Sequence, residues 1–184
     1  MSRIASLLLA AAVATFSVSA AQAGPIIRNA SLFETLAIEG VSLATPPEDA
    51  FNLLYANGYS AGGITTYAQW TERSLNMVRG NYGGPQGQSS VTLGRADDRL
   101  AMITQSLNRQ GIDAAAEISA VQSHFGIAAN EPDCKMNNAG TGGSCQLRDL
   151  ADPAAATMKF SMTALPTMIL RSVSRPQELV KTLQ

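Results

Sequence analysis

His124 is the only histidine of the chain, and imidazole is the side chain that most readily exchanges a proton near neutral pH. A catalytic histidine commonly activates a nucleophile, but no G-x-S-x-G motif occurs in the sequence. His124 lies beside the apolar stripe of an expected helix, close to its end, where the helix dipole stabilises a partly positive ring. A structural role is therefore favoured over catalysis.

Two other stretches could be read as chemistry. Asp97 and Asp98 could form a catalytic carboxylate pair or a cation site, but adjacent residues point in different directions and the pair suits a chain reversal. The glycine-rich residues 81–88 lack the lysine and the strand–loop–helix context of a phosphate-binding loop. We therefore expect no catalytic residue and no cofactor.

Cys134 and Cys145 are the only cysteines. Their spacing excludes a C-x-x-C redox motif, and together with one histidine they are too few ligands for a structural zinc site. Asp133, Asn137 and Asn138 could be imagined as calcium ligands, but the EF-hand pattern is absent. The pair predicts a structural disulfide between Cys134 and Cys145 and no metal site.

Residues 1–23 have the pattern of a cleaved signal peptide. Arg3 precedes an apolar run, and Ala21-Gln22-Ala23 is an A-x-A cleavage site. The alternative, a retained membrane helix, needs about 20 apolar residues, and this run is shorter. Gly24 rather than cysteine follows, so no lipid anchor is expected. We expect a periplasmic or secreted protein.

Residues 24–184 suit one domain with a substantial core. The whole chain carries 13 basic and 14 acidic residues, with a formal net charge of −1 and no basic run. This balance argues against nucleic acid or an anionic membrane as the partner.

The best-defined local pattern spans residues 38–59. Val41 and Leu43 predict a short strand, and T-P-P-E from Thr45 predicts a helix N-terminus with Thr45 as the N-cap. The apolar stripe contains Ala50, Phe51 and Leu54, with Leu53 as a further candidate. Gly58 is the expected left-handed stop, followed by an apolar tyrosine.

Residues 40–50, G-V-S-L-A-T-P-P-E-D-A, closing on Asn57-Gly58-Tyr59, resemble the opening of small exported bacterial domains. Relatives of that general style are the SmpA/OmlA outer-membrane assembly lipoproteins and β-lactamase-inhibitor-protein-like domains. The sequence departs from the pattern at Ala44 and Thr45. The resemblance implies helices laid on an antiparallel sheet and an exported protein, and it carries over no functional residue.

A second helix is expected over residues 113–125, with Asp113 as N-cap and Gly126 as the stop. Strands are expected at residues 64–71, 75–78, 90–94, 99–107, 156–163 and 167–174. Strands in runs favour an antiparallel sheet. The expected fold is α+β, with two main helices on one face of that sheet. The helix starts lie about 68 residues apart, which suggests a duplicated helix-plus-sheet unit.

The absence of nucleophile, metal and cofactor motifs favours a non-catalytic exported domain that binds a protein or an envelope component. The alternative is a small hydrolase of envelope material that uses carboxylates or His124. No pair of acids stands out in the sequence to support it.

Overall fold

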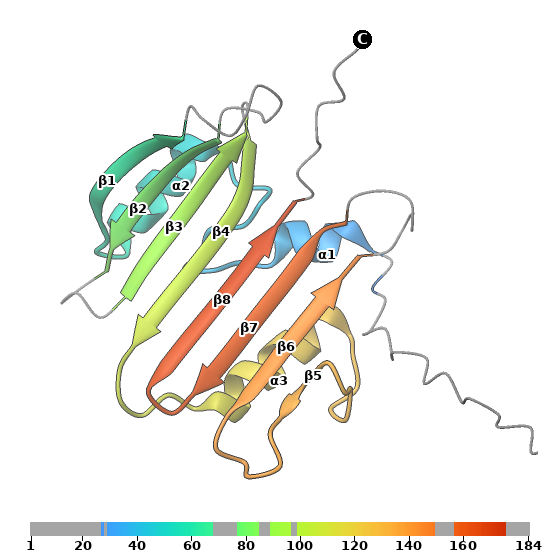
Figure 1. Cartoon of the computed structure of the whole chain (residues 1–184). Coiled ribbons are helices and arrows are strands. Elements are labelled where there is room, and N and C mark those ends of the chain that lie inside the picture. The colour runs from blue at the N-terminus through green and yellow to red at the C-terminus, as the bar shows by residue number, and fades with distance from the viewer. Residues whose placement is uncertain are drawn as a thin grey trace, which may run out of the picture.

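The computed structural model describes residue 27 and residues 29–67, 77–84, 89–96, 99–149 and 157–175; for residues 61–67, 77–83 and 96 the backbone alone is described. The described chain is mixed α+β, which confirms the expected class. The elements are α1 (Ala30–Thr35), α2 (Pro47–Ala56), β1 (Ser60–Tyr67), β2 (Met77–Gly83), β3 (Ser89–Ala96), β4 (Arg99–Asn108), α3 (Ala114–Phe125), β5 (Cys134–Met136), β6 (Gly143–Arg148), β7 (Lys159–Leu165) and β8 (Met168–Ser174) (Figure 1).

The strands form one eight-stranded sheet in the order β1-β2-β3-β4-β8-β7-β6-β5, and every pair is antiparallel. The antiparallel prediction is therefore confirmed. Four strands follow α2 and pair in chain order, and four strands follow α3 and do the same. The two groups meet where β4 pairs with β8, at the middle of the sheet (Figure 1).

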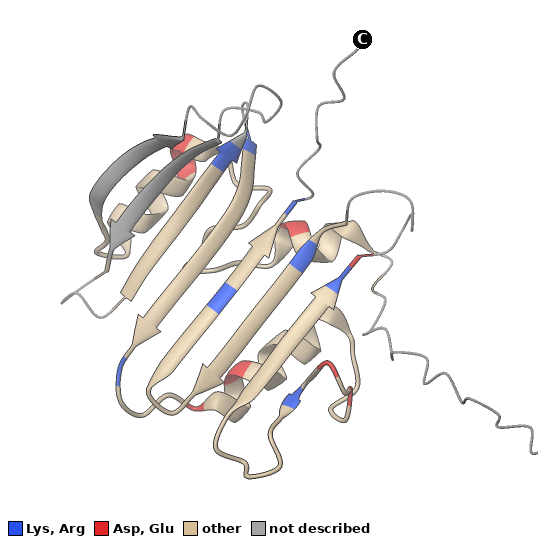
Figure 2. Ribbon diagram, viewed as in Figure 1, with Lys and Arg blue, Asp and Glu red and all other residues tan. Residues whose placement is uncertain are grey.

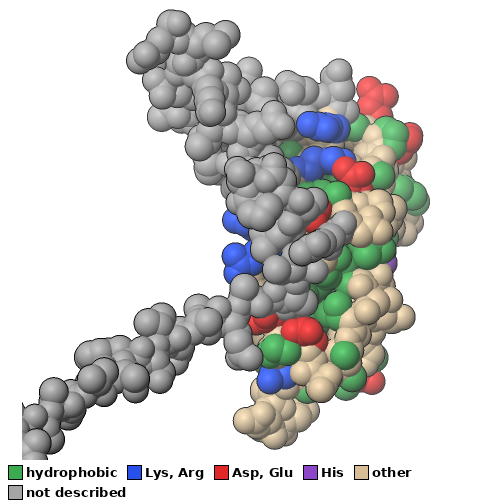
Figure 3. Space-filling view, turned by 90° about the vertical axis from the view of Figure 1, so that its right-hand side faces the viewer, with side chains coloured by type: hydrophobic (Ala, Val, Ile, Leu, Met, Phe, Trp, Pro, Cys, Tyr) green, Lys and Arg blue, Asp and Glu red, His purple; other side chains and the backbone are tan. Residues whose placement is uncertain are grey.

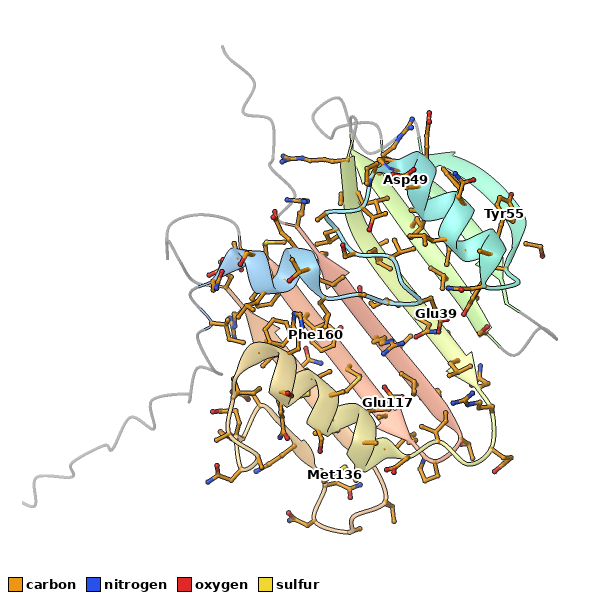
Figure 4. The ribbon with its side chains drawn as sticks, turned by 180° about the vertical axis from the view of Figure 1, so that it is seen from behind. Glu39, Asp49, Tyr55, Glu117, Met136 and Phe160 are labelled. Atoms are coloured by element: carbon orange, nitrogen blue, oxygen red, sulfur yellow. A yellow bond between two sulfur atoms is a disulfide. The ribbon has the colours of Figure 1, made fainter. Side chains whose placement is uncertain are left out.

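Figure 4, seen from behind, draws α1, α2 and α3 on the near side of the sheet. Helix α3 contacts β5, β6 and β7. The approach is close at Gly143 of β6, since a Cβ there would lie 2.6 Å from Cγ1 of Ile118. Buried apolar side chains from the helices and strands form one core cluster, which includes Phe33, Leu54, Ile118 and Phe160.

Helix α3 follows its sequence prediction. The Asp113 carboxylate accepts a hydrogen bond from the Ala116 backbone N–H at 3.0 Å, which satisfies one free donor of the first turn. At the other end Gly126 has φ +64°, and the Ile127 N–H donates to the Gln122 carbonyl at 3.0 Å. Capping and the spacing of the buried side chains therefore specify this helix locally.

Helix α2 ends as predicted but begins differently. Gly58 has φ +82°, and the Tyr59 N–H donates to the Leu54 carbonyl at 2.9 Å. The prediction of Thr45 as N-cap is wrong: Pro46 holds that position and makes no side-chain cap. The Thr45 hydroxyl instead accepts from the Ser42 N–H at 3.0 Å, because the chain turns immediately before the helix. The hydroxyl therefore stabilises the turn.

The short strand expected at Val41 and Leu43 is also wrong. Ile38 and Val41 form an isolated bridge around Glu39 and Gly40, both of which have positive φ. The apolar side chains of Ile38, Val41 and Leu43 are nevertheless buried. The alternating apolar residues belong to a tight turn that packs into the core. In the sequence, such a turn shows the same alternation as a short strand.

Strands β3, β4, β7 and β8 match their predictions within a few residues, whereas β1 and β2 are displaced. Strands β5 and β6 are not among the predicted strands. Strand β1 spans Ser60–Tyr67 and not the expected residues 64–71, and β2 extends through the glycines to Gly83. Glycine-rich sequence does not by itself define where a strand begins or ends. Here the extent of each strand is set by its hydrogen bonds to the neighbouring strand. Residues 1–23, Trp70, Asp97, Asp98 and the end of the chain after residue 175 lie outside the described residues.

Candidate functional site: the hydroxyl face of the sheet

Alternation along the strands gives the sheet two different faces. On β7, Phe160, Met162 and Ala164 are buried in the core. Lys159, Ser161 and Thr163 alternate with them and therefore point to the opposite face. Figure 1 views the sheet from this second side, with the helices behind it.

A row of polar side chains crosses five strands on this second face. The cross-strand partners run from Thr92 to Thr104, Ser172, Ser161 and Gln146. Thr104 and Ser172 form a hydrogen bond between their hydroxyl oxygens at 2.9 Å. Neighbouring strands lie about 4.8 Å apart, so the row places four hydroxyl residues and Gln146 at regular intervals.

A second row is parallel to the first and is more mixed. Ser106, Leu170 and Thr163 are partners across β4, β8 and β7. Leu170 is 46% exposed, although it lies on a central strand. We define the hydroxyl face by six residues on the same side of the sheet as this leucine: Thr92, Thr104, Ser106, Ser161, Thr163 and Ser172.

At one end the face becomes basic. Arg148 of β6 and Lys159 of β7 are direct register partners, and both are exposed. Figure 2 shows the basic positions on the neighbouring ends of these two strands. In Figure 3 basic side chains project on the left, the side that faces the viewer in Figure 1.

A hollow of about 420 Å³ adjoins the two basic residues. Its lining includes Gln146, Arg148, Lys159, Ser161, Ser172 and Ser174. These six residues occupy two adjacent rows of outward-facing positions on β6, β7 and β8. We call this hollow, with these six residues, the basic hollow.

The helix side carries a different polar cluster, centred on Arg171 of β8. Arg171 Nε donates to Gln105 Oε1 at 2.6 Å, and Gln105 Nε2 donates to a Glu39 carboxylate oxygen. The arginine also lies 3.5 Å from the carboxylate of Glu117 on α3. Figure 4 shows Glu39 and Glu117 on different elements of this side. Because Gln105 is fully buried, the cluster satisfies a polar group inside the core.

Arg175 forms a second link on the helix side. Its guanidinium pairs with the Glu34 carboxylate and donates to the carbonyls of Leu43 and Leu100 at 3.0 Å each. It thereby connects α1, the turn before α2, and the start of β4. The three glutamates Glu34, Glu39 and Glu117 are thus each engaged by an arginine. This arrangement suits a structural link better than a proton donor or acceptor.

His124 is engaged as well. Its Nε2 lies 2.6 Å from the Leu32 carbonyl oxygen, and its ring meets Phe125 edge-on at a centroid distance of 5.0 Å. The histidine therefore connects α3 to α1. Within the described part of the chain, its ring pairs with this backbone carbonyl and not with a serine, a cysteine or a carboxylate.

The predicted disulfide is confirmed: Cys134 and Cys145 are bonded and are register partners on β5 and β6. Within the described ranges, no group of three or more His, Cys, Asp or Glu side chains is placed to hold a metal ion. The chain reversal expected at Asp97 and Asp98 remains a prediction, because both residues lie outside the described ranges. Sequence reasoning missed Arg148, Lys159 and Arg171, although strand alternation could have assigned the first two to one face once the register was known.

No family model, no curated protein and no solved structure matches this chain. None of the helices in the described segments is long and apolar enough to cross a membrane. We therefore infer function from the geometry of the two faces of the sheet.

Proposed function

We propose that this protein is a non-catalytic exported domain that binds a protein partner, or another envelope component, through its hydroxyl face. The observation that carries the proposal is Leu170, an exposed leucine among the hydroxyl groups of a broad sheet face. An apolar centre with a polar rim is the usual composition of a protein interface. No described helix covers this face (Figure 1).

We also propose the duplicated helix-plus-sheet architecture that is expected from the sequence. In it, α2 and α3 together close one face of the sheet as two copies of a helix-plus-four-strand unit. The order of elements supports this, since each helix precedes four strands paired in chain order. Covering one face with helices would leave the other face for a partner.

Export is part of the same proposal. The disulfide between Cys134 and Cys145 suits an oxidising compartment, since cytosolic thiols are normally kept reduced. The A-x-A site ending at Ala23 supports removal of residues 1–23. N-terminal sequencing of the exported protein should begin at Gly24, and retention of the first 23 residues would contradict this.

The competing function is hydrolysis by carboxylates or by His124. Against it, Glu34, Glu39 and Glu117 are paired with arginines, and His124 Nε2 lies against a backbone carbonyl. A general acid or base must instead reach the reacting group directly. Hydrolysis of envelope material that is lost in Glu117→Gln or His124→Gln would favour the competing function.

The test uses two exposed leucines on different surfaces. Leu170 is 46% exposed on β8 and Leu53 is 39% exposed on α2, so substitution to Glu makes the same chemical change at similar exposure. The partner is first captured from envelope extract and purified, and its affinity for each variant is then measured.

Leu170→Glu should weaken binding at least tenfold, which corresponds to about 1.4 kcal/mol. Leu53→Glu should bind like the wild type. Equal binding by both variants, with both still folded, would overturn the use of the hydroxyl face. A loss confined to Leu53→Glu would assign the interface to α2.

A further inference from the structure

Arg148 and Lys159 lie directly opposite each other in the antiparallel pair of β6 and β7. Like charges at such positions repel and destabilise the sheet, whereas an opposite charge at either position would stabilise it. The ion pairs of the described residues involve Arg171 and Arg175, and neither member of this basic pair takes part in them. A local arrangement that opposes folding stability is typical of a functional site.

Hydrogen-bond donors surround these two charges. Ser161, Ser172 and Ser174 contribute hydroxyl groups to the basic hollow, and Gln146 contributes an amide. The hollow measures about 420 Å³, which is enough room for an acidic side chain. Two cations and several neutral donors form a site for an oxygen anion.

We propose that the basic hollow binds the carboxylate side chains of an acidic segment of the protein partner. The inference rests on the proposed function, because it names the chemistry of the partner at one end of the hydroxyl face. Arg148 and Lys159 supply the charge, and the serine hydroxyls orient the carboxylate oxygens.

A carboxylate fits this site better than a phosphate. Phosphate sites commonly use backbone N–H groups at a helix N-terminus or in a glycine-rich loop. The backbone of β6, β7 and β8 is instead paired in the sheet ladder. Asp133 also lines the hollow, and its negative charge disfavours a dianion more strongly than a single carboxylate.

The direct test titrates the purified protein with an acetylated and amidated hexaglutamate peptide at low salt, followed by amide NMR shifts. The variants are Arg148→Gln/Lys159→Gln and the control Arg109→Gln, which removes an exposed cation from the connection between β4 and α3. Inorganic phosphate is titrated in a parallel arm, because it would reveal a general oxyanion site.

The peptide should shift the amides of Ser161 and Ser172 in the wild type and in Arg109→Gln. The double variant should bind at least tenfold more weakly. No peptide binding by the wild type, or equal weakening by the double variant and Arg109→Gln, would overturn the inference. Phosphate binding as tight as peptide binding at the same amides would overturn the carboxylate assignment.

Lys159→Glu separates stability from binding. It replaces the repulsive pair by an opposite-charge pair with Arg148, so the denaturation midpoint should rise while peptide binding is lost. A lower midpoint with unchanged peptide binding would contradict the role of this pair.

Affinity for the captured partner distinguishes the two proposals. If Arg148→Gln/Lys159→Gln leaves partner affinity unchanged and Leu170→Glu lowers it, the inference about the acidic segment fails and the proposed function survives. If neither variant changes partner affinity, both proposals fail.

Discussion

Arg171 illustrates how a half-buried charged side chain can stabilise the core by pairing with a buried polar residue. Its Nε atom supplies a donor to Gln105, whose side chain is fully buried. The arginine side chain itself is 21% exposed, so the pair joins the core to the surface. Removing one partner leaves a buried polar atom without its hydrogen bond, which costs more than removing both.

Arg171→Met should therefore lower the free energy of unfolding by about 1–3 kcal/mol, since Gln105 Oε1 loses its donor. The double variant Arg171→Met/Gln105→Leu should regain part of this loss. Chemical denaturation of the two single variants and the double variant gives the coupling energy. Additive losses in the double variant would show that the two side chains contribute independently.

Residue-scale prediction from the sequence succeeded where chemistry is local. The disulfide could be predicted because the chain has two cysteines and they allow one pairing. The partners of Arg171 could not, because Glu39, Gln105 and Glu117 come from three separate elements. The pairing of Arg148 with Lys159 could not be predicted either, because it depends on the register of β6 and β7.

At the scale of elements, helix α2 agrees with the sequence prediction at its end and only in part along its buried face. Its end at Gly58 and the buried positions Ala50 and Leu54 agree with the sequence pattern. Phe51 is half-buried rather than central, and Leu53 is exposed. The buried stripe of α2 is therefore narrower than the sequence predicted. Among these side chains, Leu54 should contribute most to the free energy of unfolding.

Leu54→Ala should cost about 2–5 kcal/mol, because the side chain is fully buried and its loss leaves a cavity. Phe51→Ala should cost less than Leu54→Ala, and the exposed Asn52→Ala should stay within about 0.5 kcal/mol of the wild type. Denaturant midpoints at constant slope measure the order. A larger loss for Asn52→Ala than for Leu54→Ala would reverse the assigned helix face.

The strands show the complementary limit of local reasoning. Strands β7 and β8 could be predicted because apolar and polar residues alternate and a proline-containing turn separates them. Strand β1 is rich in glycine and its pairing with β2 shifts register between Ala61 and Gly63. Its boundaries therefore depend on a neighbouring strand more than on its own residues.

At the scale of the whole molecule, the disulfide secures the outer end of the sheet. Strand β5 has three residues and pairs with β6 alone, and Cys134 is bonded to its register partner on β6. So short an edge strand gains little from its own hydrogen bonds. The cross-link therefore contributes substantially to the order of this edge.

Replacement of both cysteines by alanine should lower the free energy of unfolding by about 2–4 kcal/mol and leave the fold intact. The largest increase in amide hydrogen exchange should occur in residues 134–136, with β4 and β8 remaining protected. Uniform loss of protection across the sheet would show instead that the cross-link is required for the whole fold.

The two faces of the sheet differ in composition. The helix side contains the core and the arginine-centred links, whereas the hydroxyl face presents Leu170 and the basic hollow. An alternative surface exists on α2, where Leu53 and Tyr55 are exposed. Binding measurements must therefore distinguish the hydroxyl face from α2.

Hydroxyl-radical footprinting of the complex with the captured partner makes this distinction most directly, because it reports the solvent access of individual side chains. We expect the partner to lower the oxidation rate of Leu170 and to leave the oxidation rates of Leu53 and Tyr55 unchanged. Protection of Leu53 and Tyr55 with Leu170 still oxidised at its free rate would contradict binding through the hydroxyl face.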